Sequence, residues 1–509
     1  MESAQAPRLD VLADVGRSES LPGNVVNDIH SRLNPTTVEE IVAVRSLESL
    51  RQAVQRARSQ GRTICIAGGR HAMGAQQFGT QALLLDMTGH NRVLSFNKEA
   101  GTIEVEAGIK WPKLIDFLVS SQQQDVHQWG IVQKQTGADS LTLGGALSAN
   151  VHGRGLKMRP IIADVESFVL VGADGQPRRV SRRQNSELFS LAVGGYGLFG
   201  VIASVELHLT PRRKLRRIVE VVRSADLMAA FDSAIAGGAL YGDFQFAIDN
   251  GSDDFLRRGV LSTYQPVDPE TPVPDAQRKL SLADWQRLVY LAHHSKSEAF
   301  AEYRRHYLAT SGQIYWSDTH QLSMYLDDYH RALAPGAASS GPPGSEVITE
   351  IYVPRSSLAG FLEAVRDDFK NDSVNVIYGT VRLIEKDCES FLAWARDSYA
   401  CVIFNLHTEH THQGIEHSAR VFRRLIDLAI ALKGSYYLTY HKFATLAQLL
   451  ACYPQFPEFV KLKQTYDPDE TFQSDWYRHY RKLLDKRLSC ALSPSSAPGP
   501  CEMPGKCRE

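Results

Sequence analysis

The sequence predicts an α+β fold, in which helices and antiparallel hairpins alternate without the regular succession of a β-α-β protein. Two hairpins are predicted in the first half of the chain: "RVLSFNKEAGTIEVEAG" alternates apolar and polar residues around a glycine-containing turn, and "ESFVLVGADGQPRRV" turns at residues 173–175. The second half contains four strand-like runs separated by helices: "EVITEIYVP", "VIYGTVRLIE", "CVIFNLHT" and "SYYLTYHK". We expect these runs to form an antiparallel or mixed sheet with helices on one side.

Other elements of the first half have clear boundary signals. After Ser46, apolar residues spaced three and four apart predict an amphipathic helix that ends at Gly61. "TICIA" and "ALLLDM" are predicted buried strands. "WPKLIDFLV" is a predicted helix because Pro112 stands near its start, where the missing N–H costs nothing. "GVIASVELHLTP" is a predicted long strand that Pro211 closes.

The composition is that of an ordinary globular protein. Of 509 residues, 43% are hydrophobic and 22% are charged, and the net charge of −1 gives no reason to expect nucleic-acid or anionic-membrane binding. No uncharged apolar run reaches the ~18 residues of a membrane span, and the N-terminus shows no secretory signal. Seven cysteines without a CxxC pair favour reduced thiols and a cytoplasmic location.

The segment "GYGLFG", from Gly195 to Gly200, matches the GxGxxG pattern of dinucleotide-binding Rossmann folds. In those folds the motif follows a strand and opens a helix, so that the pyrophosphate meets the helix N-terminus. Here the helical run "SELFSLAV" comes before the motif and the strand "VIASVEL" comes after it. We therefore expect no nicotinamide-type Rossmann site.

Three glycine-rich segments adjoin strands or open helices, where free backbone N–H groups favour a diphosphate: "AGGRHAMG", "TGADSLTLGGALSANVHGRG" and "GGYGLFGVI". With the C-terminal run "YPQFPEFVKLKQTYDPDETFQSDWYRHY", they resemble the vanillyl-alcohol-oxidase family of flavoproteins, which have a PCMH-type FAD-binding domain. The chain is most similar to the branch that contains the sugar-lactone oxidases and decaprenylphosphoryl-ribose oxidase. The resemblance extends from about Asn34 to Leu484.

The resemblance implies a two-domain architecture, a number of domains that the length also predicts. The PCMH-type FAD-binding domain covers residues 30–215, and a substrate or cap domain with an antiparallel sheet flanked by helices covers residues 216–470. Residues 471–487 return to the FAD-binding domain. Residues 1–29 form an N-terminal extension, and the proline-rich residues 488–509 form a disordered tail. Within the cap domain, "APGAASSGPPG" has the composition of a mobile linker or lid.

The resemblance also implies that FAD is the cofactor and that His71 bonds covalently to its 8-methyl carbon. The alternative is that His71 packs beside a non-covalent FAD. The second glycine-rich segment contains no cysteine, so a second covalent link is not expected. The predicted cofactor-binding residues are Ala67, Gly68, Gly69, Arg70, His71, Ala72, Gly74, Gln76, Thr136, Gly137, Thr142, Gly144, Gly145, Ser148, Asn150, His152, Gly200, Val201 and Ile202.

The strand-like runs of the second half each combine an apolar face with a polar one. A face of this kind suits a site that binds hydroxyl groups and stabilises developing oxyanions, although it is also compatible with a solvated sheet surface. The residues predicted to share polar faces are Tyr378 with Thr380 and Arg382, Asn405 with His407, and Tyr440 with Lys442.

Four residues are predicted to be catalytic. Arg382 matches the arginine of the Glu-x-Arg strand of the sugar-lactone oxidases, but Thr380 stands in place of the glutamate, which puts lactone oxidation in doubt. Tyr440 aligns with a lysine of the ribose oxidase, and Lys442 lies two residues further on. His407 is the preferred general base, because a neutral imidazole accepts a hydroxyl proton at neutral pH.

The run "HTEHTHQGIEH" places His407, His410, His412 and His417 close together in the sequence. It lacks HExxH and passes from a strand through a loop into a helix, so its histidines would not share one helical face. We expect exposed loop histidines and no metal site in this run.

The sequence therefore predicts an FAD-dependent oxidoreductase that transfers a hydride from an alcohol or sugar-like CH–OH group to flavin N5. Oxygen or another acceptor would reoxidise the flavin. Two alternatives stay open: a sterol-reductase-like enzyme that reduces a carbon–carbon double bond, and a flavin-binding protein without turnover. The expected partner is a small-molecule substrate.

Overall fold

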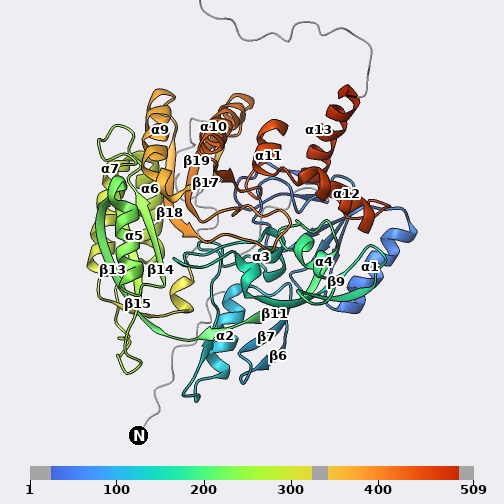
Figure 1. The fold of residues 1–509 in the computed structure, drawn as a ribbon, viewed down its shortest axis with the longest axis horizontal. Helices are drawn as coiled ribbons and strands as arrows, with labels where there is room; N and C mark the ends of the chain where they lie inside the picture. The colour runs from blue at the N-terminus through green and yellow to red at the C-terminus, as the bar shows by residue number, and fades with distance from the viewer. Residues whose placement is uncertain (1–23, 324–341, 492–509) are drawn as a thin grey trace, which may run out of the picture.

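The computed structural model describes residues 24–323 and 342–491, and the fold is α+β as predicted (Figure 1). Two sheets are built from the first half of the chain. A five-stranded sheet contains both predicted hairpins, in the order β10 (Pro177–Ser181), β9 (Val165–Val171), β11 (Val201–His208), β7 (Thr102–Glu106) and β6 (Val93–Asn97). A three-stranded parallel sheet has the order β3 (Glu40–Ala43), β5 (Leu83–Asp86) and β4 (Ile64–Ala67).

The helices of this half begin where the sequence signals stand. Ser46 and Ser49 form a capping box at the start of α1 (Leu47–Ser59), and Pro112 occupies the first turn of α2 (Trp111–Ser121). The GxGxxG segment does lie between helix α4 (Ser186–Ala192) and strand β11, which confirms that its order is opposite to that of a Rossmann site.

The second half forms one eight-stranded sheet in which all paired strands are antiparallel. Its order is β16 (Ile314–Trp316), β13 (Lys214–Arg223), β15 (Arg258–Pro266), β14 (Tyr241–Phe246), β18 (Val376–Ile384), β19 (Tyr399–Glu409), β17 (Gly344–Pro354) and β20 (Ser435–Tyr436). Two short pairs complete the described strands: β1 (Val25–Val26) with β2 (Thr36–Thr37), and β8 (Trp129–Gly130) with β12 (Thr210–Pro211).

Two expectations for this sheet were wrong. "SYYLTYHK" continues only to Tyr436 as a strand and then becomes a loop, so Tyr440 and Lys442 do not share a strand face. Helices also cover both faces of the sheet instead of one. Helix α5 (Leu227–Ala236), α9 (Leu358–Asn371) and α10 (His412–Ala431) pack against it, and α6 (Leu282–His294) and α7 (Lys296–Ala309) contact β18, β13 and β15 through a separate apolar cluster.

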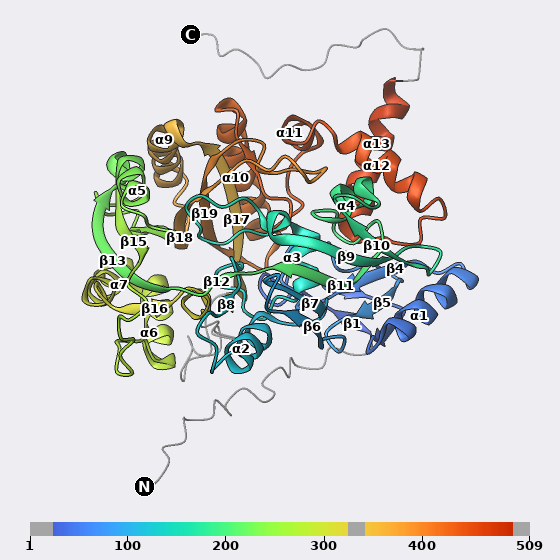
Figure 2. The same ribbon diagram turned by 60° about the horizontal axis from the view of Figure 1, so that its bottom comes forward.

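The C-terminal part returns to the first-half sheets, where α12 and α13 lie beside the N-terminal elements (Figure 2). Phe472 pairs in parallel with Ile64 of β4, and the Thr80 hydroxyl donates to the Asp475 carboxylate at 2.7 Å. The helices here are α11 (Leu446–Cys452), α12 (Phe456–Tyr466) and α13 (Asp475–Ala491). Helix α13 therefore continues past the predicted tail boundary at 488. The rest of that tail, residues 1–23 and most of "APGAASSGPPG" lie outside the described residues.

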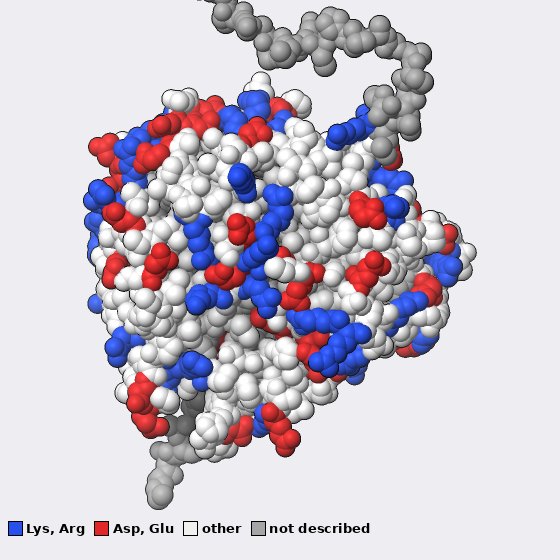
Figure 3. Space-filling view, in the orientation of Figure 1, with Lys and Arg blue, Asp and Glu red and all other residues white. Residues whose placement is uncertain are grey.

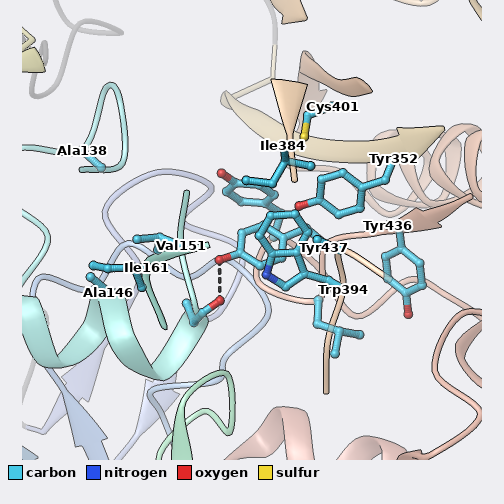
Figure 4. Close-up of a cluster of buried hydrophobic side chains, with 14 of the residues drawn as sticks. Ala138, Ala146, Val151, Ile161, Tyr352, Ile384, Trp394, Cys401, Tyr436 and Tyr437 are labelled. Atoms are coloured by element: carbon cyan, nitrogen blue, oxygen red, sulfur yellow. Dashed lines mark hydrogen bonds between the residues drawn. The ribbon is translucent and has the colours of Figure 1, made fainter. Parts of the chain in front are cut away.

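Buried aromatic residues join the large sheet to the first half of the chain (Figure 4). Tyr352 of β17 stacks on Trp394 with ring centroids 4.6 Å apart. The Tyr437 hydroxyl donates to the Ala149 carbonyl at the end of α3 (Leu143–Ala149) at 2.6 Å. One continuous apolar core thus extends through both halves, and it fixes the position of the large sheet relative to the glycine-rich segments.

On the face drawn in Figure 3, basic and acidic side chains are intermixed, as the net charge of −1 leads one to expect. Among the described helices, none combines the length and apolar character that crossing a bilayer requires.

Candidate active site

A cavity of about 1140 Å³ lies where the glycine-rich segments meet the large sheet. Part of this space is open to solvent, and residues from all three glycine-rich segments border it. Most of the predicted cofactor-binding residues line it: Gly68, Gly69, Arg70, His71, Ala72, Gln76, Thr136, Gly137, Thr142, Gly144, Gly145, Ser148, Gly200 and Ile202.

Five predicted cofactor-binding residues lie behind this lining. Ala67 and Val201 point into apolar clusters beneath the cavity. Gly74 donates its N–H to the Gln76 side chain at 2.9 Å. Asn150 ends α3 in the left-handed conformation and donates to the Asp387 carboxylate at 2.9 Å, while His152 pairs with Glu350. Their segments border the cavity, but these five residues are not part of its lining, because a motif does not show which side of a segment faces a cavity.

Two glycines allow the first and second glycine-rich segments to touch. A Cβ on Gly68 would lie 2.0 Å from Oγ1 of Thr142, and a Cβ on Gly69 would lie 2.3 Å from the carbonyl oxygen of Ser140. Side chains at these positions would push the segments apart and open the wall of the cavity.

Unpaired polar atoms in the lining indicate that the cavity is built for a polar ligand. The side-chain oxygens Oγ1 of Thr136 and Oε1 of Gln135 are buried and have no hydrogen-bond partner among the described residues. A buried polar atom without a partner costs about 1–3 kcal/mol. The glycine-rich lining, the glycine contacts and these unsatisfied atoms together fit FAD.

His71 lies in this lining beside a second histidine that the sequence reasoning missed. Nδ1 of His71 is 2.8 Å from Nε2 of His30, which also lines the cavity. Burial, reinforced by His30, holds the pKa of His71 well below its usual range, and burial lowers the pKa of His30 to about 4 against the opposing charge of Asp28. Both imidazoles are therefore neutral at neutral pH, and a neutral imidazole is the nucleophilic form.

A buried polar cluster stands behind the cavity wall that the large sheet supplies. Glu350 of β17 contacts His152 through its carboxylate, and both side chains are fully buried. Tyr440 lines the cavity and accepts a hydrogen bond from Gln135 Nε2 at 3.2 Å. The guanidinium of Arg382 is 4% exposed, and its Nε and Nη1 have no hydrogen-bond partner among the described residues.

The charges of this polar cluster influence one another. Burial alone would raise the pKa of Glu350, but His152 and Arg382 hold it below the usual range, so the carboxylate is ionised. Burial and the nearby Glu350 carboxylate raise the pKa of Tyr440 well above its usual value, so the phenol keeps its proton. A protonated phenol beside an ionised carboxylate can donate a hydrogen bond to one partner and accept from another.

The structure separates the four predicted catalytic residues. Tyr440 lines the cavity, whereas Arg382 belongs to the polar cluster behind the cavity wall and is not part of the lining. His407 instead contacts Glu346, at 3.1 Å between Nδ1 and Oε1, and does not line the cavity. Lys442 also lies outside the lining; burial lowers its pKa, and Asp475 of α13 opposes that change. The prediction that Lys442 shares a strand face with Tyr440 was wrong, because this segment is a loop, to which strand alternation does not apply.

Glu350 was not among the predicted site residues, although the pattern of "EVITEIYVP" could have indicated it. Strand alternation places Glu346, Ile348 and Glu350 on one face of β17, and a glutamate in the middle of a long apolar strand is rarely buried without a functional partner. Ile348 itself lines the cavity. His30, Tyr196, Tyr437 and Thr439 also line it without having been predicted.

Comparison with known proteins agrees with this geometry. Residues 38–181 match a family model described as an FAD binding domain. L-gulono-1,4-lactone dehydrogenase of Mycobacterium tuberculosis is 24% identical over 446 residues, which cover 86% of this chain and 95% of the relative. The chain is an FAD-dependent oxidoreductase.

Shorter matches fall in the same branch. L-gulonolactone oxidase of Mus musculus is 29% identical to this flavoprotein over 168 residues, or 33% of this chain and 36% of the relative. Decaprenylphosphoryl-beta-D-ribose oxidase of Mycolicibacterium smegmatis is 27% identical over 205 residues, or 39% of this chain and 42% of the relative. The predicted resemblance to the sugar-lactone oxidase and ribose oxidase branch is thereby confirmed.

Proposed function

We propose that this flavoprotein oxidises a CH–OH group of an alcohol or sugar-like substrate. Residues 30–215 with the returning segment 471–487 would hold FAD, and residues 216–470 would form the cap that binds substrate. FAD, when bound, supplies an acceptor for two electrons, and oxygen or another acceptor regenerates it. The observation that carries the proposal is the buried cluster of Glu350, His152, Arg382 and Tyr440 at the cavity wall.

Tyr440 and Glu350 supply a route for the hydroxyl proton. Tyr440 lines the cavity, and its phenol lies against the Glu350 carboxylate. The phenol would pass its own proton to that carboxylate while its oxygen takes the proton of the substrate hydroxyl. Tyr440 would thus stay protonated, and Glu350 would hold the released proton. Glu350 Oε2 has no hydrogen-bond partner among the described residues and is the acceptor atom.

From its place behind the cavity wall, Arg382 would stabilise the negative charge that develops on the substrate oxygen. Its guanidinium is buried and has donors to spare, and a buried donor that is already in position stabilises an oxyanion strongly. Thr380 stands where the Glu-x-Arg pattern has a glutamate, but Glu350 would supply a carboxylate to this site. Thr380 and Glu350 both pair with Ile403 of β19, on opposite sides of it, so the carboxylate enters the same row of the sheet from β17.

Tyr440→Phe should lower the rate constant of anaerobic flavin reduction by substrate about 10²–10⁴-fold, since a positioned proton-transfer group contributes that much. The measurement is stopped-flow bleaching of the flavin with a panel of polyols, sugars and lactones. Tyr290→Phe is the matched control, because Tyr290 is an exposed side chain of α6.

Equal reduction rates in the two variants would remove Tyr440 from the mechanism. Bleaching by NADPH and not by any alcohol would support the double-bond reductase instead. A tightly held flavin that no compound reduces would support a binding protein without turnover.

The proposal includes a covalent bond between a nitrogen of His71 and the 8-methyl carbon of the flavin, for which a neutral imidazole in the cavity lining is suited. The N–H and C–H hydrogens that this bond displaces would pass to the flavin ring as two protons and two electrons, and oxygen or another acceptor would then reoxidise the ring. On acid precipitation, the yellow colour should stay with the pellet of the wild-type protein and move to the supernatant of His71→Ala. His30→Phe should also release part of the flavin, because His30 fixes the orientation of the His71 ring. Release of all colour from the wild-type pellet would show that the flavin is not covalent.

A further inference from the structure

Three side chains from three different elements meet on the outer part of the large sheet. His293 comes from the last turn of α6, Glu346 from β17 and His407 from β19. Glu346 Oε1 lies 3.3 Å from His293 Nε2 and 3.1 Å from His407 Nδ1. The two imidazole rings stand almost perpendicular to each other, at 86°, with centroids 5.4 Å apart. We call these three residues the His-Glu-His cluster.

The donor atoms of the cluster have the type and spacing of a zinc site. One ligand atom from each residue lies within 4.8 Å of the others. Zinc binds imidazole nitrogen and carboxylate oxygen at about 2.0–2.2 Å in a tetrahedron, so adjacent ligand atoms stand about 3.3 Å apart. The two contacts of Glu346 Oε1, at 3.1 and 3.3 Å, are therefore close to the edge length of a zinc tetrahedron.

The cluster is partly shielded from water and still accessible. The side chains of His293, Glu346 and His407 are 12%, 5% and 25% exposed. Glu346 also lines a second cavity of about 980 Å³ between α6, α7 and the sheet. A metal ion can therefore reach the cluster, and its ligands are held by packing on three separate elements.

We propose that the His-Glu-His cluster binds a divalent transition-metal ion, with Zn²⁺ the best match to two imidazoles and one carboxylate. The three protein ligands leave one coordination position for water or another small ligand. Because His293 belongs to α6 and the other two residues to the sheet, the ion would fasten the α6–α7 pair to the sheet beside the second cavity.

Among the described residues, the other histidine groups are engaged elsewhere. Of the histidine run predicted to be exposed, His410 lies 2.8 Å from the Ser345 hydroxyl and His417 lies 3.9 Å from Asp372. A second group, His152 with Glu350 and Cys401, has suitable spacing but belongs to the buried cluster at the flavin cavity. Its three side chains are fully buried.

Gly344 provides an independent constraint on the ring of His407. A Cβ on Gly344 would lie 2.5 Å from Cε1 of His407 and 2.7 Å from its Nε2. Gly344→Ala should therefore turn the imidazole away from Glu346 and weaken metal binding while all three ligands remain present.

The test uses the full-length, flavin-loaded protein, treated with a chelator and then titrated with Zn²⁺ in a calorimeter. Co²⁺ serves as a spectroscopic probe, since tetrahedral Co²⁺ absorbs visible light strongly. We expect one ion per chain, and at least a 100-fold weaker binding constant in His293→Ala and His407→Ala. Zn²⁺ should raise the melting temperature of the wild-type protein and leave that of these variants unchanged.

His294→Ala is the matched control, because His294 is the next residue of α6, is exposed, and bonds the Tyr290 carbonyl at 2.9 Å instead of the cluster. It should bind Zn²⁺ as the wild type does. Glu346→Gln keeps the shape of the cluster and should also bind more weakly, which covers the case in which an alanine variant fails to fold. No stoichiometric binding in the wild type, or equal binding in His407→Ala and His294→Ala, would overturn the proposal. Neither result depends on whether an alcohol reduces the flavin.

Discussion

Glu350→Ala is expected to lower the free energy of unfolding by about 3–5 kcal/mol, because it leaves the buried Arg382 guanidinium without a nearby opposite charge. His152 and Arg382 would both lose the carboxylate that faces them. The flavin should also lose substrate-driven reduction, since the Tyr440 phenol would have no acceptor for its proton. Urea denaturation measures the first effect and anaerobic stopped-flow absorbance the second.

Two further variants separate charge from shape. Glu350→Gln keeps the side-chain volume and a hydrogen bond to His152, so it should lower the free energy of unfolding less than Glu350→Ala does. Flavin reduction by substrate should nevertheless be as slow in Glu350→Gln as in Glu350→Ala. Glu363→Ala removes an exposed carboxylate that pairs with Arg257, where both side chains are 48% exposed. A surface pair of this kind contributes ~0–1 kcal/mol. Normal flavin reduction in Glu350→Gln would rule out Glu350 as the proton acceptor.

Gly69→Ala is expected to weaken FAD binding about 10–100-fold. The new Cβ would stand 2.3 Å from a backbone oxygen at Ser140, and relieving that overlap costs about 1–3 kcal/mol by moving one glycine-rich segment away from the other. The variant should be compared in a His71→Ala background, so that covalent attachment does not mask a loss of affinity. Titration of the flavin-free protein with FAD, followed by flavin fluorescence, gives the two dissociation constants.

Gly360→Ala is the control for this substitution, because Gly360 lies in α9 and a Cβ there meets no atom within 4 Å. It should bind FAD unchanged and be as stable as the parent or slightly more so. Equal FAD affinity in Gly69→Ala and Gly360→Ala would show that the contact between the segments is not needed for the cofactor.

The parts of the site that the sequence predicted are those encoded by local chemistry. Glycines beside strands, Ser46 and Pro112 at helix starts, and the reversed order around Gly195 each depend on a few neighbouring residues. The cavity lining between Gly68 and Gln76 was predicted for the same reason: one motif fixes the whole turn.

The unpredicted parts depend on contacts between distant segments. Glu350 and His152 are 198 residues apart and meet because β17 lies against the segment that follows α3. The loop that carries Tyr440 has the apolar alternation of a strand, yet it leaves the sheet at Tyr436 and turns toward the cavity, where Gln76 donates to its Leu438 carbonyl at 2.6 Å. His407 could not be separated from the site by alternation, because periodicity gives the face of a strand and not the position along it.

The parallel pairing of Phe472 with Ile64 has a consequence for how the enzyme matures. Strand β4 leads directly into the loop that carries His71, and its edge is completed by residues made some 400 positions later. Phe472 must therefore be synthesised before this edge of β4 is paired. We therefore expect a fragment of the chain that ends before Phe472 to be less stable around β4, because Ile64 would lose the segment that pairs with it.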